Sequence, residues 1–315
     1  MSDKLGELLV TALRWEAQDV ISVELQSPNR SPLPAFTAGA HIDLHLPGNI
    51  IRSYSLLNDQ RETNRYVIGV GLDAASRGGS RYIHQELRVG TVLTVAGPRN
   101  HFPLIEASAE HVLIAGGIGI TPMLAMLRRL SALGRKVSFY YAVREKSRQA
   151  FTADIAALCA AHFHIDAEQG TPLDLQKIVA AHPHAEFYCC GPLPMLAAFE
   201  TATASLPPER VHLEYFTAKA QDKSAESKSF QVECKKSGKT IEVLPEISIA
   251  DALIKAGIDV PISCCEGICG SCETAILEGE AEHRDSVLSK QEKASNKMMM
   301  VCVSRAKGNR LVLDI

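Results

Sequence analysis

Four cysteines gathered in one short stretch are the feature of this sequence with the clearest chemical potential. The stretch SCCEGICGSC contains Cys264, Cys265, Cys269 and Cys272, and a further cysteine, Cys302, follows closer to the C-terminus. Thiolates are soft anionic ligands for metal centres. Nine cysteines in a chain of 315 residues, with four of them in one tight group, favour ligation or catalysis over a framework of disulfides.

The spacing within this group favours an iron–sulfur centre. The pattern C-x4-C-x2-C with a distant fourth cysteine is the plant-type arrangement that holds a [2Fe-2S] cluster. The alternative is a structural zinc site, but zinc ligands are usually spaced as paired C-x2-C units. We expect the fourth ligand to arrive from a strand, and we interpret Cys265 as a thiol that is not a ligand. The predicted ligands are Cys264, Cys269, Cys272 and Cys302.

Two motifs in the N-terminal third could bind a phosphate-bearing cofactor. RSYSLLN includes Arg52 and Tyr54, and SRGGSRYIHQEL includes Gly78, Gly79 and Ser80. Gly-Gly-Ser at the start of a short helix exposes N–H groups that suit a phosphate, while the arginine could add a charge-assisted hydrogen bond and the tyrosine an aromatic face. Each motif alone also has an ordinary interpretation, since strand arginines are often solvated and Gly-Gly pairs often form turns.

A third motif, HVLIAGGIGITPMLAML, predicts a strand, a glycine turn and a helix. Gly116, Gly117 and Gly119 would let the backbone approach a dinucleotide, and Thr121 could hydrogen-bond either cofactor. Pro122 falls in the first helical turn, where a missing N–H costs nothing.

A fourth motif, YCCGPLPM, ends another predicted strand. Open α/β sheets bind ligands at the C-terminal ends of strands, so Cys190, Gly191 and Pro192 are candidates, although most free cysteines are simply small buried hydrophobes. Arg144 and Arg148 follow a second strand, where a basic residue could meet a ribose 2′-phosphate or could be an ordinary surface charge.

The elements around these motifs change character along the chain. Short apolar runs separated by Pro and Gly turns predict an antiparallel barrel or sandwich up to about residue 102, and strands then alternate with helices, which is typical of a parallel sheet. The polar stretch AKAQDKSAESKS indicates a linker. After it we expect a hairpin, a helix, the cysteine loop and terminal strands. The predicted divisions are 1–105, 106–218, 219–229 and 230–315.

Composition limits the classes of partner. The chain is 46% hydrophobic with a net charge of −3, and it has no basic run that would favour nucleic acid or an anionic membrane. The N-terminal segment mixes charges among its apolar residues, and no stretch is apolar for long enough to span a bilayer. We therefore expect a cytoplasmic protein.

Taken together and in this order, RSYSL in a barrel, AGGIGITPM opening an α/β domain and CGP before its last helix resemble the ferredoxin–NADP reductase superfamily. With the plant-type cysteine motif at the C-terminal end, the whole chain resembles phthalate dioxygenase reductase and its relatives, including vanillate demethylase reductases. The resemblance implies an antiparallel β-barrel flavin domain, an α/β parallel-sheet nicotinamide domain and a β-grasp ferredoxin-like domain.

The resemblance also implies cofactors and roles. Its RGGS loop serves a single phosphate, which favours FMN over FAD, and NADH is the expected hydride donor. Cys190 would lie near the hydride path, so with Thr121 it is the residue expected closest to the chemistry. Phe216 aligns with an aromatic that faces the flavin, with a core position as the alternative. Cys265 stands where relatives usually carry arginine. The implied flavin contacts are Arg52, Ser53, Tyr54, Ser55, Gly71, Leu72, Gly78, Gly79 and Ser80.

The function that the resemblance implies is an NADH-dependent reductase that supplies electrons to a terminal Rieske-type oxygenase acting on an aromatic substrate. Two other functions stay open from sequence. One is a reductase for another acceptor, such as a haem monooxygenase or a dehydrogenase electron-transfer subunit. The other is a non-redox protein with a structural zinc held by four cysteines.

Overall fold

The computed structural model describes residues 4–218 and 228–315, and it divides into two compact units, Met1–Phe216 and Thr217–Ile315. Most of the predicted linker therefore lies outside the described residues. Each unit is described by itself below. No helix in the described residues is both long enough and apolar enough to cross a membrane.

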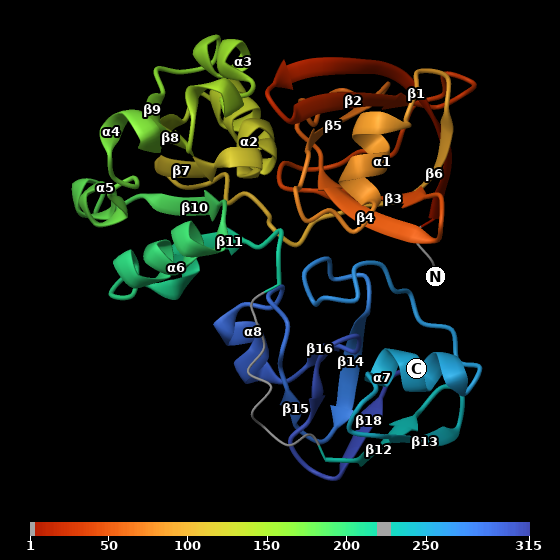
Figure 1. Cartoon of the computed structure of the whole chain (residues 1–315). Coiled ribbons are helices and arrows are strands. Elements are labelled where there is room, and N and C mark those ends of the chain that lie inside the picture. Colours follow the sequence, from red (N-terminus) through yellow and green to blue (C-terminus); the bar gives the residue numbers. More distant parts are fainter. Residues whose placement is uncertain (1–3, 219–227) are drawn as a thin grey trace. The chain divides into compact units, whose positions relative to one another are not determined.

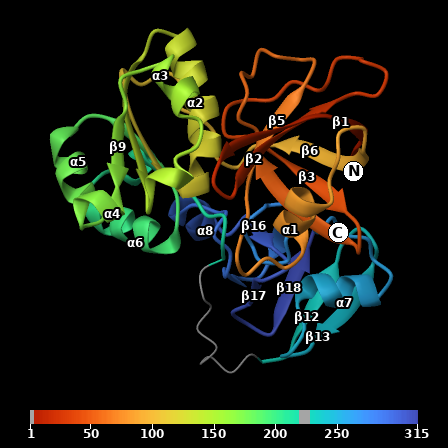
Figure 2. The same ribbon diagram turned by 45° about the horizontal axis from the view of Figure 1, so that its top comes forward.

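The first unit begins with the predicted antiparallel barrel, a six-stranded sheet in the order β4-β3-β6-β1-β2-β5. An isolated bridge between Leu56 and Ile68 brings its two edges together, and Figure 2 shows the strands curling round, with helix α1 at one end. Buried side chains such as Val10, Ile42 and Val95 fill the interior. The elements are β1 (Lys4–Ala17), β2 (Val20–Gln26), β3 (His41–Leu46), β4 (Ile50–Ser55), β5 (Tyr66–Gly71), α1 (Gly79–Gln85) and β6 (Val92–Arg99).

The predicted parallel sheet follows in the same unit, with the order β11-β10-β7-β8-β9 (Figure 1). Because β7 is the first of these strands in the chain and lies between β8 and β10, the strand order reverses between β7 and β10. The strands are β7 (Glu110–Gly116), β8 (Lys136–Val143), β9 (His162–Ile165), β10 (Glu186–Cys190) and β11 (Val211–Glu214). The helices are η1 (Gly117–Gly119), α2 (Ile120–Ala132), η2 (Lys146–Arg148), α3 (Thr152–Ala156), α4 (Asp166–Gln169), α5 (Leu175–Ala181), α6 (Leu193–Ala202) and η3 (Pro208–Arg210).

Two elements of this sheet differ from the sequence prediction. The helix expected over AFTADIAALCAAH is reduced to α3, because the chain must enter β9 at His162 to pair with β8. The strand expected over FHIDAE ends at Ile165, and Asp166 begins the short helix α4.

The barrel and the parallel sheet share buried side chains. One apolar cluster joins Leu124 and Tyr141 of the α/β part to Ala17, Leu57 and Phe102 of the barrel part. Burial of apolar surface is the main favourable contribution to folding, so this shared cluster holds the two parts as one unit.

The second unit has its own apolar cluster, which includes Val232, Leu253 and Leu311. Its five-stranded sheet has the order β13-β12-β18-β14-β16, with β12 and β18 parallel, and β15 pairs with β17. Capping boxes begin both helices, at Ser248 and Ser289. The elements are β12 (Phe230–Cys234), β13 (Lys239–Val243), α7 (Ile249–Lys255), β14 (Glu273–Glu278), β15 (Ala281–Glu282), α8 (Lys290–Ser295), β16 (Met298–Met300), β17 (Arg305–Ala306) and β18 (Arg310–Leu313).

Candidate cofactor and electron-transfer sites

The four predicted ligand cysteines come together in the second unit. Their thiols interact in pairs, Cys264 with Cys269 and Cys272 with Cys302, and Cys264 also reaches Cys302. Cys302 lies in the turn after β16 and not within a strand as expected, because β16 ends at Met300 and the backbone turns there. The fourth thiol still arrives from an element distant in sequence.

The backbone of the cysteine loop also points toward these sulfur atoms. The N–H of Glu266 donates to Cys264 Sγ at 3.3 Å, and the N–H of Gly267 donates to the Cys302 thiol. Ser271 Oγ lies 3.0 Å from Cys269 Sγ. A thiolate can only accept, so with Cys269 ionised the hydroxyl of Ser271 donates. N–H and O–H groups directed at sulfur stabilise negative charge on the ligands.

Gly267 shows how tightly this loop is folded. Its φ is +68°, and a Cβ atom there would lie 2.6 Å from Val303 Cγ2 and 3.0 Å from Asp285 Cα. The carbonyl of Gly267 accepts a hydrogen bond from the N–H of Ser286 at 2.8 Å. Only glycine fits a left-handed position with neighbours this close. Contacts with Asp285 and Ser286 therefore fix the position of the cysteine loop.

These observations test whether a [2Fe-2S] cluster suits the residues present. Within residues 4–218 and 228–315, no three His, Cys, Asp or Glu side chains are grouped in a way that would hold a single metal ion. The thiols are instead arranged as two linked pairs. Four cysteine thiolates are the donor set of a two-iron cluster, so the residues fit that group. Cys265 is exposed with a φ of +55° and takes no part in the pairs.

In the first unit, Arg52 lies across the start of helix α1. A Cβ atom on Gly79 would lie 2.6 Å from Arg52 Cγ, so the glycine makes room for the arginine. The guanidinium donates to the carbonyls of Ile51 and Arg77. The structure thus brings together Arg52 and the Gly78–Ser80 loop, two of the motifs proposed from sequence for a phosphate.

The other predicted flavin residues lie on both faces of β4 and at the end of β5. Burial raises the pKa of Tyr54, which packs against the apolar cluster of the barrel. Ser53 Oγ donates to Asp43 Oδ1 at 2.6 Å, and Asp43 alternates along β3 with the core residues Ile42 and Leu44. Ser80 Oγ donates to Ser76 Oγ at 2.9 Å. Gly71 ends β5, and the N–H of Leu72 donates to the carbonyl of Asp19.

The predicted dinucleotide loops meet where the strand order reverses. A Cβ atom on Gly119 would lie 2.2 Å from the carbonyl oxygen of Cys190, and one on Gly116 would lie 2.7 Å from Pro192 Cδ. A Cβ atom on Gly191 would lie 3.1 Å from the Cα of Gly116. Because these three residues are glycines, the loop after β7 and the loop after β10 can touch through their backbones. This is the crevice in which open α/β sheets bind ligands.

Cys190 and Thr121, the residues expected closest to the chemistry, are both buried. Cys190 belongs to the shared apolar cluster, and burial together with the nearby Glu214 raises the pKa of its thiol. Thr121 Oγ1 donates to the carbonyl of Ile118 at 3.1 Å, which leaves its lone pairs as acceptors. Neither side chain is open to solvent in this structure.

The remaining candidates lie at the edges of the site. Phe216 is 36% exposed just beyond β11, so it is not the core residue that sequence allowed as the alternative. Arg144 is exposed after β8, whereas Arg148 forms a 2.6 Å ion pair with Asp19 of the barrel. Of the two basic residues that the sequence offers after this strand, Arg148 is therefore engaged by a carboxylate of the barrel.

Sequence reasoning missed Glu214. It is the register partner of Cys190 on β11, and the Ser55 hydroxyl of the flavin strand donates to its carboxylate. Its Oε2 is inaccessible to solvent and has no hydrogen-bond partner among the described residues. Burial raises the pKa of Glu214 to about 8, so the carboxyl group is poised to hold a proton between the predicted flavin strand and Cys190. The signal in the sequence was an acidic residue inside the apolar run VHLEYF.

Glu214 should make the stability of the first unit depend on pH. Its pKa is about 8 in the folded state, whereas an ordinary glutamate has a pKa of 4.5, so between these pH values the folded chain keeps a proton that the unfolded chain releases. The free energy of unfolding should therefore fall as pH rises through this interval. Glu214→Gln should remove this dependence on pH.

The free energy of unfolding of both proteins is measured by denaturant unfolding at pH 5, 7 and 9. The variant should become more stable relative to the native chain as pH rises. The same difference in unfolding free energy at all three pH values would contradict the raised pKa of Glu214.

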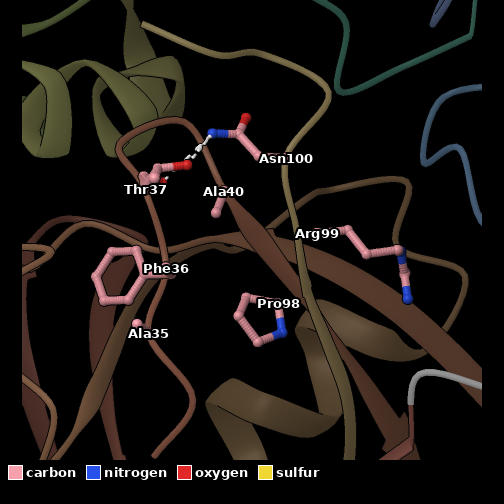
Figure 3. Close-up of a pocket in the computed structure, with 7 residues that line it drawn as sticks. All are labelled: Ala35, Phe36, Thr37, Ala40, Pro98, Arg99 and Asn100. Atoms are coloured by element: carbon pink, nitrogen blue, oxygen red, sulfur yellow. Dashed lines mark hydrogen bonds between the residues drawn. The ribbon is translucent and has the colours of Figure 1, made fainter.

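A pocket of about 210 Å³ lies in the barrel and contains none of the predicted flavin residues (Figure 3). Its polar groups are already engaged, because Asn100 Nδ2 donates to Thr37 Oγ1 at 2.8 Å and Arg99 pairs with Asp43. The lining residues are Ala35, Phe36, Thr37, Ala40, Pro98, Arg99 and Asn100.

Comparison with known proteins agrees with this architecture. Residues 232–307 match the family model of the 2Fe-2S iron-sulfur cluster binding domain, and residues 113–201 match the oxidoreductase NAD-binding domain. The chain is 48% identical to the phenoxybenzoate dioxygenase subunit beta of Ectopseudomonas oleovorans over 98% of this chain and 97% of that protein. The match at the cysteine loop decides for iron–sulfur over zinc.

Solved structures that are similar over 98% of this chain include the following two. The structure of phthalate dioxygenase reductase is 38% identical with a TM-score of 0.70, and 97% of that protein is covered. An intact type IV self-sufficient cytochrome P450 monooxygenase is also 38% identical, with a TM-score of 0.92, but this chain spans only 41% of its length.

The chain belongs to the phthalate dioxygenase reductase family of NAD-dependent iron–sulfur reductases, and its relatives include reductase subunits of oxygenase systems. The predicted fold is confirmed: a flavin barrel, an α/β nicotinamide domain and a C-terminal ferredoxin-like domain. FMN, NADH and a [2Fe-2S] cluster are the cofactors that accompany this family.

Proposed function

We propose that this chain is a cytoplasmic reductase that takes hydride from NADH onto FMN and delivers electrons through a [2Fe-2S] cluster to a Rieske-type terminal oxygenase acting on an aromatic substrate. A bound flavin would accept two electrons from NADH and release them one at a time. The protein would position the cofactors and set their electrostatic surroundings.

The observation that carries this proposal is the meeting of three elements inside the first unit. Ser55, on the strand assigned to flavin, bonds Glu214, and Glu214 pairs in register with Cys190 at the crevice assigned to NADH. The two redox sites thus share a boundary of a few side chains. In the second unit, the two pairs of thiols would hold the [2Fe-2S] cluster, which carries one electron at a time.

We assign the residues as follows. In this proposal residues 1–105 bind FMN, 106–218 bind NADH and 230–315 carry the cluster. Arg52 and the Gly78–Ser80 loop hold the FMN phosphate, while Tyr54, Leu72 and Phe216 contact its ring. The NADH contacts are Gly116, Gly117, Gly119, Thr121, Arg144, Cys190, Gly191 and Pro192. The cluster ligands are Cys264, Cys269, Cys272 and Cys302.

The test compares the full chain with a chain ending at residue 218. Both are mixed anaerobically with NADH while flavin and iron–sulfur absorbance are followed, and a purified Rieske-type oxygenase is then added. The full chain should reduce the oxygenase, whereas the shortened chain should reduce its flavin and stop there. Reduction of the oxygenase by the shortened chain would overturn the proposed route.

A haem monooxygenase is the second candidate acceptor, and one observation favours it. The self-sufficient P450 described above contains a region similar to nearly the whole of this chain. Parallel reductions of a Rieske-type oxygenase and a P450 under the same conditions discriminate between the two acceptors, and a faster P450 reduction would replace our assignment.

A further inference from the structure

The turn between β1 and β2 connects the barrel to the nucleotide-binding part of the first unit. Gln18 and Asp19 form this two-residue turn, with Asp19 at a φ of +60°. The carboxylate of Asp19 pairs with Arg148 at 2.6 Å, and the N–H of Gln18 donates to the carbonyl of Ser147 at 2.9 Å. Two neighbouring residues of the barrel thus bond two neighbouring residues of the segment after β8.

The same turn also reaches the predicted flavin site. The carbonyl of Asp19 accepts from the N–H of Leu72 at 2.7 Å, directly after β5. A Cβ atom on the adjacent Gly71 would lie 3.4 Å from the side chain of Ile118, which belongs to the dinucleotide loop. Asp19 therefore touches the end of a strand assigned to flavin through its backbone and the segment that follows β8 through its side chain.

This ion pair is poorly placed to stabilise the fold. The side chains of Arg148 and Asp19 are 43% and 32% exposed. Pairs of this kind are screened by water and typically contribute at most about 1 kcal/mol. What the pair can supply is a fixed position. Ser147 and Arg148 lie beyond the C-terminal end of β8, at the sheet edge where a dinucleotide binds.

We propose that Asp19 is a positioning residue for hydride transfer, which holds the segment after β8 against the flavin strand so that the nicotinamide meets the flavin ring. The inference rests on the proposed function, since it concerns the step from NADH to FMN. Hydride transfer is sensitive to alignment, and a displacement of about 1 Å can slow such a step by up to about a hundredfold.

The experiment uses the full chain with its cofactors. Asp19→Asn keeps the size of the side chain and the tolerance for a left-handed backbone, and it removes the charge. Arg148→Gln removes the same pair without altering the turn, so it tests the inference even if the first variant folds poorly. Anaerobic stopped-flow measures the limiting rate of flavin reduction with NADH and with NADH deuterated at the transferred position.

Each single variant should reduce flavin about tenfold more slowly and show a larger deuterium isotope effect. The double variant should be no slower than either single one, because both remove the same interaction. The flavin content, the iron–sulfur spectrum and the thermal midpoint should not change. These readouts separate positioning from a general loss of structure.

Lys136→Gln is the matched control. Lys136 is the first residue of β8, at the end of the strand opposite Ser147 and Arg148, and it forms a 2.7 Å ion pair with Glu110. This variant should reduce flavin at the native rate. Native rates and isotope effects in both Asp19→Asn and Arg148→Gln would overturn the inference, as would fully additive losses in the double variant. Failure of NADH to reduce the flavin of the native chain would instead overturn the proposed function.

Discussion

Gly119→Ala should nearly abolish the reduction of flavin by NADH. The new Cβ atom would lie 2.2 Å from the carbonyl oxygen of Cys190 and 2.9 Å from the N of Gly191, and backbone atoms cannot rotate away as a flexible side chain can. The loops after β7 and β10 must therefore separate at the crevice assigned to nicotinamide. We expect anaerobic stopped-flow to show a rate at least about a hundredfold lower.

Gly308→Ala is the control for this variant, because a Cβ atom at Gly308 would meet nothing within 4 Å. The flavin content of Gly119→Ala should stay close to native, since the barrel interior is filled by residues of its own such as Ile42 and Val95. A native rate in Gly119→Ala would show that the two loops do not form the dinucleotide site.

Cys302→Ser should remove the iron–sulfur cluster and leave the reduction of flavin intact. The residue supplies the only thiol of the predicted four that does not come from the cysteine loop itself, and a serine hydroxyl is a harder and far less acidic ligand. Iron analysis should fall from about two atoms per chain toward none. NADH should still reduce the flavin, because the first unit ends at Phe216 and has its own core.

Cys265→Arg is the matched control in the same loop. Cys265 is exposed and lies outside the two pairs of thiols, so this variant should keep its iron. It also places a positive charge beside the predicted ligands, so the rate of electron delivery to the oxygenase is measured in the same variant. Loss of iron from Cys265→Arg would mean that the ligands were assigned incorrectly.

The parts of the molecule that sequence predicted well depend on local spacing. The run of thiols in SCCEGICGSC, the glycine turn in AGGIGITPM and the alternation of strands and helices each follow from neighbours within about twenty residues. These patterns were sufficient for the three kinds of fold, which the family matches confirm.

The features that sequence did not reveal depend on contacts between distant residues. Glu214 acquires its raised pKa from burial beside Cys190 and Ser55, which lie on other strands. The sequence left Arg148 open between a contact for a 2′-phosphate and a surface charge, and it did not indicate the ion pair with Asp19 in the first turn of the barrel. The surroundings of Glu214 and the ion pair of Arg148 arise only when the barrel and the parallel sheet pack together, so the sequence could not reveal them.

The apolar cluster shared by the barrel and the parallel sheet limits how genes of this kind can be recombined. A break after residue 105 would expose side chains such as Leu57 and Phe102 that are now buried in that cluster. A break after Phe216 leaves this apolar cluster whole. The second unit, which carries the predicted iron–sulfur ligands, retains its own core and a capped helix. Gene fusion, and exchange of the ferredoxin-like domain between chains, should therefore occur at the boundary after Phe216. The flavin and nicotinamide domains should be inherited together.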